Sequence, residues 1–179
     1  MRLGIDVGST TVKLVLLDEN DNIIYQRYER HMSSVFDKVK ELLQDLHDTE
    51  GNINVRCVIT GSGGLALSEK VQTKFEQEVV TCSLAIERLI PQTDVAIELG
   101  GEDAKITFFG SAVEQRMNGT CAGGTGAFID QMAILLNTDG DGLNEAAKDY
   151  KVIYPIAARC GVFAKTDIQP LINEGAPVE

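Results

Sequence analysis

The sequence predicts an α/β protein built from two copies of one unit, on the strength of three observations. A short apolar strand, residues 3–8, ends in glycine and is followed by a second strand at 12–17. The pattern returns 92 residues later, where residues 97–105 match residues 5–13 as apolar, acidic, apolar, glycine, three small or polar residues, apolar and lysine. Helical spacing of apolar residues follows each hairpin, so we expect one unit in each half of the chain.

The first unit, residues 1–92, is expected to contain five strands and three helices. Apolar runs bounded by glycine or polar turns predict strands at residues 3–8, 12–17, 23–25, 55–60 and 79–80. The first helix follows a Ser34–Asp37 pair that resembles a capping box, and it is expected to stop near Gly51. Two shorter helices are expected at 65–74 and 83–89.

The second unit, residues 93–179, is expected to repeat the hairpin and then become helical. Its expected strands are residues 94–101, 104–109 and 112–117. One helix is expected after the glycine-rich segment 119–126, another at 143–150, and a last one from Cys160. Pro170 is expected to kink or shorten this last helix.

The composition is that of a soluble globular protein with an acidic surface. Of 179 residues, 44% are hydrophobic and 24% are charged, and 16 Lys and Arg against 27 Asp and Glu give a formal net charge of −11. Such a surface repels phosphate backbones and anionic lipids, so neither nucleic acid nor a membrane is expected as a partner. No apolar run approaches the length needed to span a bilayer, and no signal peptide is recognised, so we expect a cytoplasmic location. There, the four cysteines are more often thiols or metal ligands than disulfides.

The glycine turns of the two hairpins predict a phosphate-binding site. Glycine lets backbone N–H groups approach an anion closely, and the hydroxyls of Ser9, Thr10 and Thr11 add donors at the same place. Asp6, at the end of the first strand, is suited to hold a hydrated Mg²⁺ beside a phosphate. Two such hairpins could clamp one nucleotide, because local amides and a metal outweigh the global negative charge. Two plain hairpin turns are the alternative.

Cys121 and Cys160 each stand directly before an expected helix. The amides and the dipole at a helix N-terminus lower the pKa of a thiol and stabilise anionic iron–sulfur clusters. Two ligands cannot complete a four-cysteine cluster within one chain, whereas two chains related by a two-fold axis can. The alternative is that both cysteines are small buried hydrophobic residues.

Four segments of the chain resemble motifs of one ATPase superfamily. Residues 4–11 and 98–105 resemble the first and second phosphate motifs of the actin, Hsp70 and sugar-kinase superfamily. Residues 118–128 and 158–167 resemble the cluster-ligating segments of 2-hydroxyacyl-CoA dehydratase activators, to which the ATPase subunits of benzoyl-CoA reductase are closely related. The resemblance implies a ribonuclease H-like fold of the actin and Hsp70 type, with the hairpin-plus-helix domain duplicated.

The resemblance also implies a function and a set of site residues. A homodimer of such an activator holds one [4Fe–4S] cluster and binds ATP and Mg²⁺. ATP hydrolysis then drives a low-potential electron from a ferredoxin- or flavodoxin-type donor to an acyl-CoA dehydratase or reductase. Cys121 and Cys160 are the implied cluster ligands. The residues implied in catalysis are Asp6, Glu102 and Asp103, and those implied to contact the nucleotide are Gly8, Ser9, Thr10, Thr11, Lys13, Gly100, Gly101 and Lys105.

Some features depart from the family pattern or leave alternatives open. The family's third motif, which binds adenosine, is not found, so we expect the second unit to be truncated and the chain to be part of a longer protein. Glu102 stands where many relatives have Gln, so a water-positioning role is not assigned to it. Lys13 and Lys105 would either contact phosphate or cap their strands. Cys57 and Cys82 match no ligand motif and are expected in the core.

Two other functions share the hairpins. A sugar or acid kinase of the same superfamily would transfer phosphate to a small acceptor and would give no role to the two cysteines. A nucleotide-binding docking module of a larger protein would bind ATP without hydrolysing it.

Overall fold

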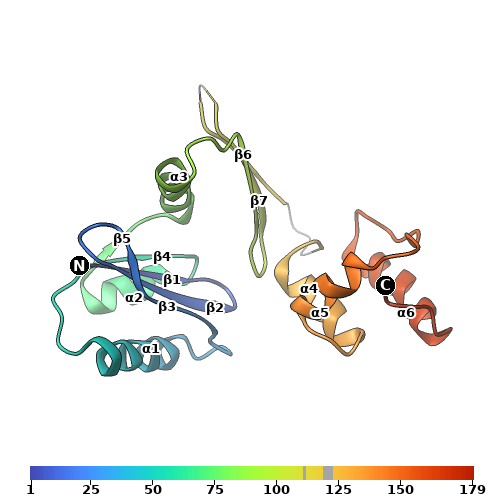
Figure 1. Ribbon diagram of the computed structural model, residues 1–179, viewed down its shortest axis with the longest axis horizontal. Coiled ribbons are helices and arrows are strands. Elements are labelled where there is room, and N and C mark those ends of the chain that lie inside the picture. The colour runs from blue at the N-terminus through green and yellow to red at the C-terminus, as the bar shows by residue number, and fades with distance from the viewer. Residues whose placement is uncertain (111, 119–122) are drawn as a thin grey trace. The chain divides into compact units, whose positions relative to one another are not determined.

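The computed structural model describes residues 1–110, 112–118 and 123–179 (Figure 1). These residues form two compact units, Met1–Thr93 and Asp94–Glu179. Within the described residues, each unit combines one sheet with three helices. Among the described residues, no helix is both long and apolar enough to pass through a membrane.

The first unit is built on a five-stranded mixed sheet. Its strands are β1 (Arg2–Val7), β2 (Thr11–Leu17), β3 (Ile23–Arg30), β4 (Arg56–Thr60) and β5 (Lys74–Phe75). Its helices are α1 (Val35–Glu50), α2 (Gly64–Val71) and α3 (Glu78–Leu89). The strand order is β3-β2-β1-β4-β5, in which β1 is antiparallel to β2 and parallel to β4. The first hairpin therefore occupies the middle of the sheet.

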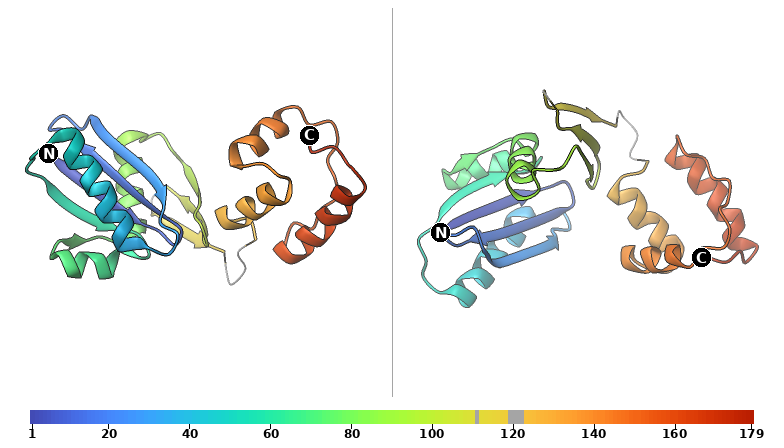
Figure 2. Two further views of the ribbon diagram at one scale, coloured as in Figure 1. Left: turned by 90° about the horizontal axis from the view of Figure 1, so that it is seen from below. Right: turned by 45° about the horizontal axis from the view of Figure 1, so that its top comes forward.

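Helix α1 covers one face of this sheet (Figure 2). Alternation along β1 and β2 buries every second side chain, and Val39, Leu42 and Leu46 of α1 join them in one core. That core comprises Leu3, Ile5, Val7, Val12, Leu14, Leu16, Tyr25, Val39, Leu42, Leu46, Ile59 and Leu67. The Tyr25 hydroxyl donates to Leu42 O at 3.2 Å and to Asp45 Oδ2 at 2.8 Å, which ties β3 to α1. Burial, together with the hydrogen bond to Asp45, raises the pKa of Tyr25 to about 12.

The strand expected at residues 79–80 is wrong, because these residues lie in the first turn of α3. The short strand β5 comes earlier, where the end of a helix is expected. Helix α2 stops at Val71, Gln72 takes a left-handed φ of 53°, and the Thr73 N–H donates to Ser68 O at 3.0 Å. The chain then returns to pair with β4. The β-branched residues Val79 and Val80 favour a strand only weakly. Residues 74–75 take the place beside β4 instead, which leaves Val79 and Val80 to the helix.

Of the two signals expected to bound α1, only the stop is confirmed. Ser34 precedes the helix but makes no side-chain bond to its amides, and its hydroxyl donates to Asp37 Oδ2 at 3.4 Å instead. The expected capping box is therefore wrong. Gly51 ends the helix with a φ of 72°, and its N–H donates to His47 O at 2.8 Å.

The second unit contains a three-stranded antiparallel sheet of order β6-β7-β8 and three helices. Its elements are β6 (Val95–Leu99), β7 (Ala104–Phe108), β8 (Glu114–Met117), α4 (Gly126–Leu135), α5 (Gly140–Lys148) and α6 (Gly161–Asn173). Helix α5 begins earlier than expected, because the Asp139 side chain accepts a hydrogen bond from the Gly142 N–H at 2.8 Å. Helix α6 continues past Pro170, so that proline does not end it.

The sequence repeat is reproduced in the register of the two hairpins. In each hairpin, the acidic residue before the turn is paired across the strands with the lysine after it, and the turn glycine donates its N–H to the carbonyl three residues later. The cross-strand pairs are Asp6–Lys13 and Glu98–Lys105, and the turn hydrogen bonds are Gly8 to Thr11, at 2.9 Å, and Gly100 to Asp103, at 2.8 Å. The two hairpins are therefore copies of one structural element.

The two copies differ in what covers them. The apolar residues of β1 are buried in the core of the first unit. Their counterparts in β6, which are Val95, Ile97 and Leu99, are 43%, 69% and 54% exposed. Strand β1 has a neighbour on each side, whereas β6 is an edge strand of its described sheet.

Replacement of Leu42 tests the core of the first unit. Leu42 is 2% exposed, so Leu42→Ala should leave a cavity and lower the free energy of unfolding by about 2–5 kcal/mol. Leu43, the next residue of α1, is 37% exposed, and Leu43→Ala should cost about 1 kcal/mol or less. Urea unfolding followed by circular dichroism measures both values, and equal losses would contradict the assignment of this core.

Candidate functional site

The expected phosphate turn, residues 8–11, follows the C-terminal end of β1, on the same side of the sheet as the C-terminal end of β4. The two strands are parallel, so the loop after β4 lies beside the end of β1. Gly63 of that loop donates its N–H to Val7 O at 2.8 Å. Gly61 has a φ of +92°, and a Cβ on it would lie 2.3 Å from Asp6 Oδ1 and 2.3 Å from Val7 O. Only glycine fits at this position.

Asp6 uses its two carboxylate oxygens differently. Its Oδ2 accepts a hydrogen bond from Lys13 Nζ at 2.7 Å. Its Oδ1 is buried and has no hydrogen-bond partner in the described part of the chain. A buried oxygen without a partner is unfavourable unless a ligand completes its coordination, and carboxylate oxygens are the ligands that Mg²⁺ prefers. Asp6 therefore fits the expected metal.

Lys13 is half-buried and is held by its ion pair with Asp6 across the first hairpin. Burial by itself would lower the pKa of Lys13, but the hydrogen bond and the charge of Asp6 outweigh burial, so the pKa is raised above its ordinary value. The Lys13 Nζ also lies 5.3 Å from the centre of the Tyr28 ring. Lys13 is thus a charged partner of Asp6, and its contact with phosphate stays a prediction.

In the second unit, the glycine turn is joined to the start of α4. The carbonyls of Gly100 and Gly101 accept hydrogen bonds from the first two amides of the helix, at 2.7 and 3.0 Å. Glu102 and Asp103 are exposed, whereas Lys105 is buried. The turn and α4 therefore form one connected element, and the contact of these residues with phosphate stays a prediction.

Cys160 is the N-cap residue of α6 and has a free, half-buried thiol. A Cβ on the next residue, Gly161, would lie 3.2 Å from Gly123 Cα, so the start of α6 contacts the segment before α4. Cys121 lies outside the described residues. Within the ranges that the structure describes, no group of three or more His, Cys, Asp or Glu side chains forms a metal site. Ligation of a cluster by Cys121 and Cys160 stays a prediction.

The other two cysteines lie in the first unit. Cys57 packs against the core from β4, and burial raises the pKa of its thiol despite a hydrogen bond with Thr73. Cys82 is half-buried on α3. Cys57 therefore has the core position expected of it, whereas Cys82 is not part of the buried cluster.

Two residues of the first site, Gly61 and His31, are absent from the set that the sequence singles out. Gly61 begins a Gly-Ser-Gly-Gly run after an expected strand, and that run was the available signal. His31 is buried beside the turn, and its backbone N–H donates to Thr10 O at 3.2 Å. No sequence pattern marks this histidine.

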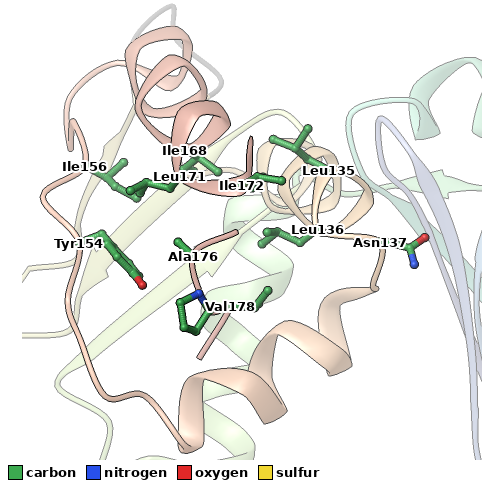
Figure 3. A pocket seen from close by; sticks show the side chains of 11 residues that line it. Leu135, Leu136, Asn137, Tyr154, Ile156, Ile168, Leu171, Ile172, Ala176 and Val178 are labelled. Carbon is green, nitrogen blue, oxygen red and sulfur yellow. The ribbon is translucent and has the colours of Figure 1, made fainter. Parts of the chain in front are cut away.

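An apolar cavity of about 320 Å³ lies in the second unit, between the end of α4, helix α6 and residues 176–178 (Figure 3). Leucine and isoleucine side chains dominate its wall, and Asn137 and Tyr154 are the polar residues that line it. None of the expected site residues lines this cavity. This cavity is therefore separate from the expected phosphate-binding residues.

Comparison with known proteins identifies one group of relatives along the whole chain. The BadF/BadG/BcrA/BcrD ATPase family matches residues 3–177. An uncharacterized protein of Methanocaldococcus jannaschii is 31% identical over 183 residues, which cover 100% of this chain and 72% of that protein. The (R)-2-hydroxyglutaryl-CoA dehydratase activating ATPase of Acidaminococcus fermentans is 29% identical over 179 residues, which cover 97% and 68%.

Two solved structures of dehydratase activators match the fold. The activator of the 2-hydroxyisocaproyl-CoA dehydratase from Clostridium difficile, with bound ADPNP, is 25% identical with a TM-score of 0.83, covering 99% of this chain and 67% of that one. Component A of the Acidaminococcus fermentans (R)-2-hydroxyglutaryl-CoA dehydratase is 26% identical with a TM-score of 0.81, covering 98% and 69%. These matches confirm the expected α/β fold and the expected family resemblance.

Replacement of Gly61 tests its close contact with Asp6. Gly61→Ala should displace Asp6 and thereby weaken binding of the ATP analogue Mg·ADPNP. It should also lower the stability, because alanine is strained at a positive φ. Gly51 is the matched control, since its φ is +72° and nothing lies within 4 Å of an added Cβ. Gly51 also has a ψ of −155°, a combination that is essentially restricted to glycine, so Gly51→Ala should cost about 1–3 kcal/mol of stability and leave binding unchanged. Calorimetric titration and urea unfolding give both quantities, and similar binding by the two variants would contradict the contact.

Proposed function

The chain belongs to the BadF/BadG/BcrA/BcrD ATPase family, and from this premise we propose that it is the ATP-dependent activator of an acyl-CoA dehydratase or a related acyl-CoA reductase. Relatives that activate such dehydratases match it along nearly its full length. The observation that carries the proposal is the place of Cys160 at the start of α6, in contact with the segment that follows Cys121. A sugar or acid kinase has no use for this arrangement.

The first hairpin would bind Mg²⁺ and phosphate. Asp6 would hold the ion through Oδ1, because this buried oxygen lacks a protein partner in the described part of the chain. The Gly8 N–H is already bonded to Thr11 O, so the Ser9 amide and the hydroxyls of Ser9, Thr10 and Thr11 would donate to the phosphates. Gly100, Gly101, Glu102, Asp103 and Lys105 would contribute the equivalent contacts from the second hairpin, whose turn has the same hydrogen bond.

Cys121 and Cys160 would hold the cluster, each subunit of a homodimer contributing both thiolates. Amides at the start of α6 would stabilise the negative charge of the bound cluster. When bound, the [4Fe–4S] cluster supplies the low-potential electron, which a ferredoxin- or flavodoxin-type protein provides and the acyl-CoA enzyme accepts.

The second hairpin offers a route from the nucleotide to the cysteines. The carbonyls of Gly100 and Gly101 hold the first two amides of α4, so a shift of this turn moves the start of the helix. The start of α6 packs against Gly123, in the segment that leads into α4, and would follow the same shift. Nucleotide contacts at the turn would thereby alter the surroundings of both cysteine segments.

The test is anaerobic purification followed by three measurements on one sample: iron and sulfide content, ATP hydrolysis, and activation of an acyl-CoA dehydratase freed of its own activator. We expect iron, hydrolysis and activation together. Phosphate transfer to a small acceptor without iron would identify a kinase instead. ATP binding with neither hydrolysis nor activation would identify a docking module.

Replacement of Cys160 separates the cluster from the nucleotide. Cys160→Ala should abolish iron binding and dehydratase activation, because one ligand is lost from each subunit, while Mg·ADPNP affinity stays within about twofold of wild type, a change below that of one lost hydrogen bond. Cys82→Ala, at a half-buried thiol of α3, is the control and should keep its iron. Iron retained by the Cys160 variant would disprove the ligand assignment.

A further inference from the structure

His31 joins the phosphate turn to the start of α1 through three hydrogen bonds. Its backbone N–H donates to Thr10 O at 3.2 Å, its ring Nε2 lies 3.2 Å from Gly8 O, and its ring Nδ1 accepts the Ser33 N–H at 3.1 Å. The residue is 7% exposed. Because Nδ1 accepts the Ser33 N–H, the ring tautomer that satisfies both contacts carries its proton on Nε2 and donates it to Gly8 O.

The segment that presents this ring has an uncommon backbone conformation. Met32 and Ser33 have φ values of 46° and 66°, in the left-handed region that residues with side chains rarely adopt. The Ser34 N–H donates to His31 O at 2.7 Å and closes the turn before α1. Strained backbone of this kind persists where surrounding contacts over-determine it, and it clusters at functional sites.

The hydrogen bond to Gly8 O fixes the orientation of one peptide group in the turn. In a trans peptide the C=O and the N–H point in opposite directions, so a Gly8 carbonyl held by His31 directs the Ser9 N–H to the other side. Among the described residues, Ser9 has no hydrogen-bond partner, which leaves its N–H available to an anion. Glycine at position 8 allows this peptide to reverse easily, and a reversed peptide would present a carbonyl oxygen instead.

We propose that His31 is a positioning residue of the nucleotide site, which locks the Gly8–Ser9 peptide so that its N–H faces the phosphates of ATP. The proposal rests on the proposed phosphate-binding role of residues 8–11. His31 acts through the turn, and its removal weakens nucleotide binding while leaving the cysteine segments intact. The donor on Nε2, rather than the size of the ring, is the feature that matters.

Two substitutions of His31 separate the donor from the rest of the side chain. Gln places an amide nitrogen near the position of Nε2 and can donate to Gly8 O, whereas Asn reproduces only the acceptor at the position of Nδ1. His31→Asn should raise the Kd of Mg·ADPNP about tenfold, and His31→Gln should stay within about twofold of wild type. His47→Asn, at the other histidine, which is exposed on α1, should change nothing.

Equal loss in the Asn and Gln variants, or no loss in either, overturns the proposal, as does wild-type protein that binds no Mg·ADPNP. The ¹⁵N shifts of the wild-type imidazole provide a test that does not depend on folding of the variants, and a proton on Nδ1 overturns the proposal. Dehydratase activation separates the two ideas. If the variants show the expected affinities but the protein does not activate a dehydratase, only the proposed function is contradicted. If the protein activates a dehydratase but His31→Asn binds Mg·ADPNP as tightly as wild type, only the role of His31 is contradicted.

Discussion

The contact between the end of β1 and the loop after β4 is the constraint on which the first site depends. Parallel pairing of these strands brings Gly61 so close that a Cβ would lie 2.3 Å from both Asp6 Oδ1 and Val7 O. The same loop fixes Val7 O through the amide of Gly63. The Asp6 carboxylate therefore has little freedom, and its one unpaired oxygen is held in place before any ligand arrives.

The turn beyond Asp6 is fixed by backbone contacts on several sides. Gly8 donates to Thr11 O across the turn, while His31 bonds to the carbonyls of Gly8 and Thr10. The carbonyls of Gly8, Thr10 and Thr11 are thus engaged by the protein, and the Ser9 amide is a donor that the turn can still offer an anion. An acidic chain can bind a polyphosphate in this way, because the attraction comes from oriented local dipoles and a metal ion rather than from net charge.

The parts of the fold that local pattern determines were predictable, and those that depend on strand order were not. Both hairpins follow from short-range alternation around a glycine turn. The ion pair of Lys13 with Asp6 is not among the predictions from sequence, because Lys13 is expected there to contact phosphate or to cap its strand. Val79 and Val80 misled because β-branched residues accept a helix when another segment takes the sheet edge. The contact of Gly61 with Asp6 arises only once β4 lies beside β1, which no local pattern shows.

The junction between the second glycine turn and α4 has a consequence for how these sequences can diverge. A side chain at position 126 would meet Gly100 O at 3.1 Å, and the first two amides of α4 are already bonded to the carbonyls of Gly100 and Gly101. A substitution in the turn is therefore constrained by the start of α4, and a substitution at the start of α4 is constrained by the turn. Positions 100 and 126 should be inherited as a unit, with glycine retained at both or with the turn and the helix start changing together.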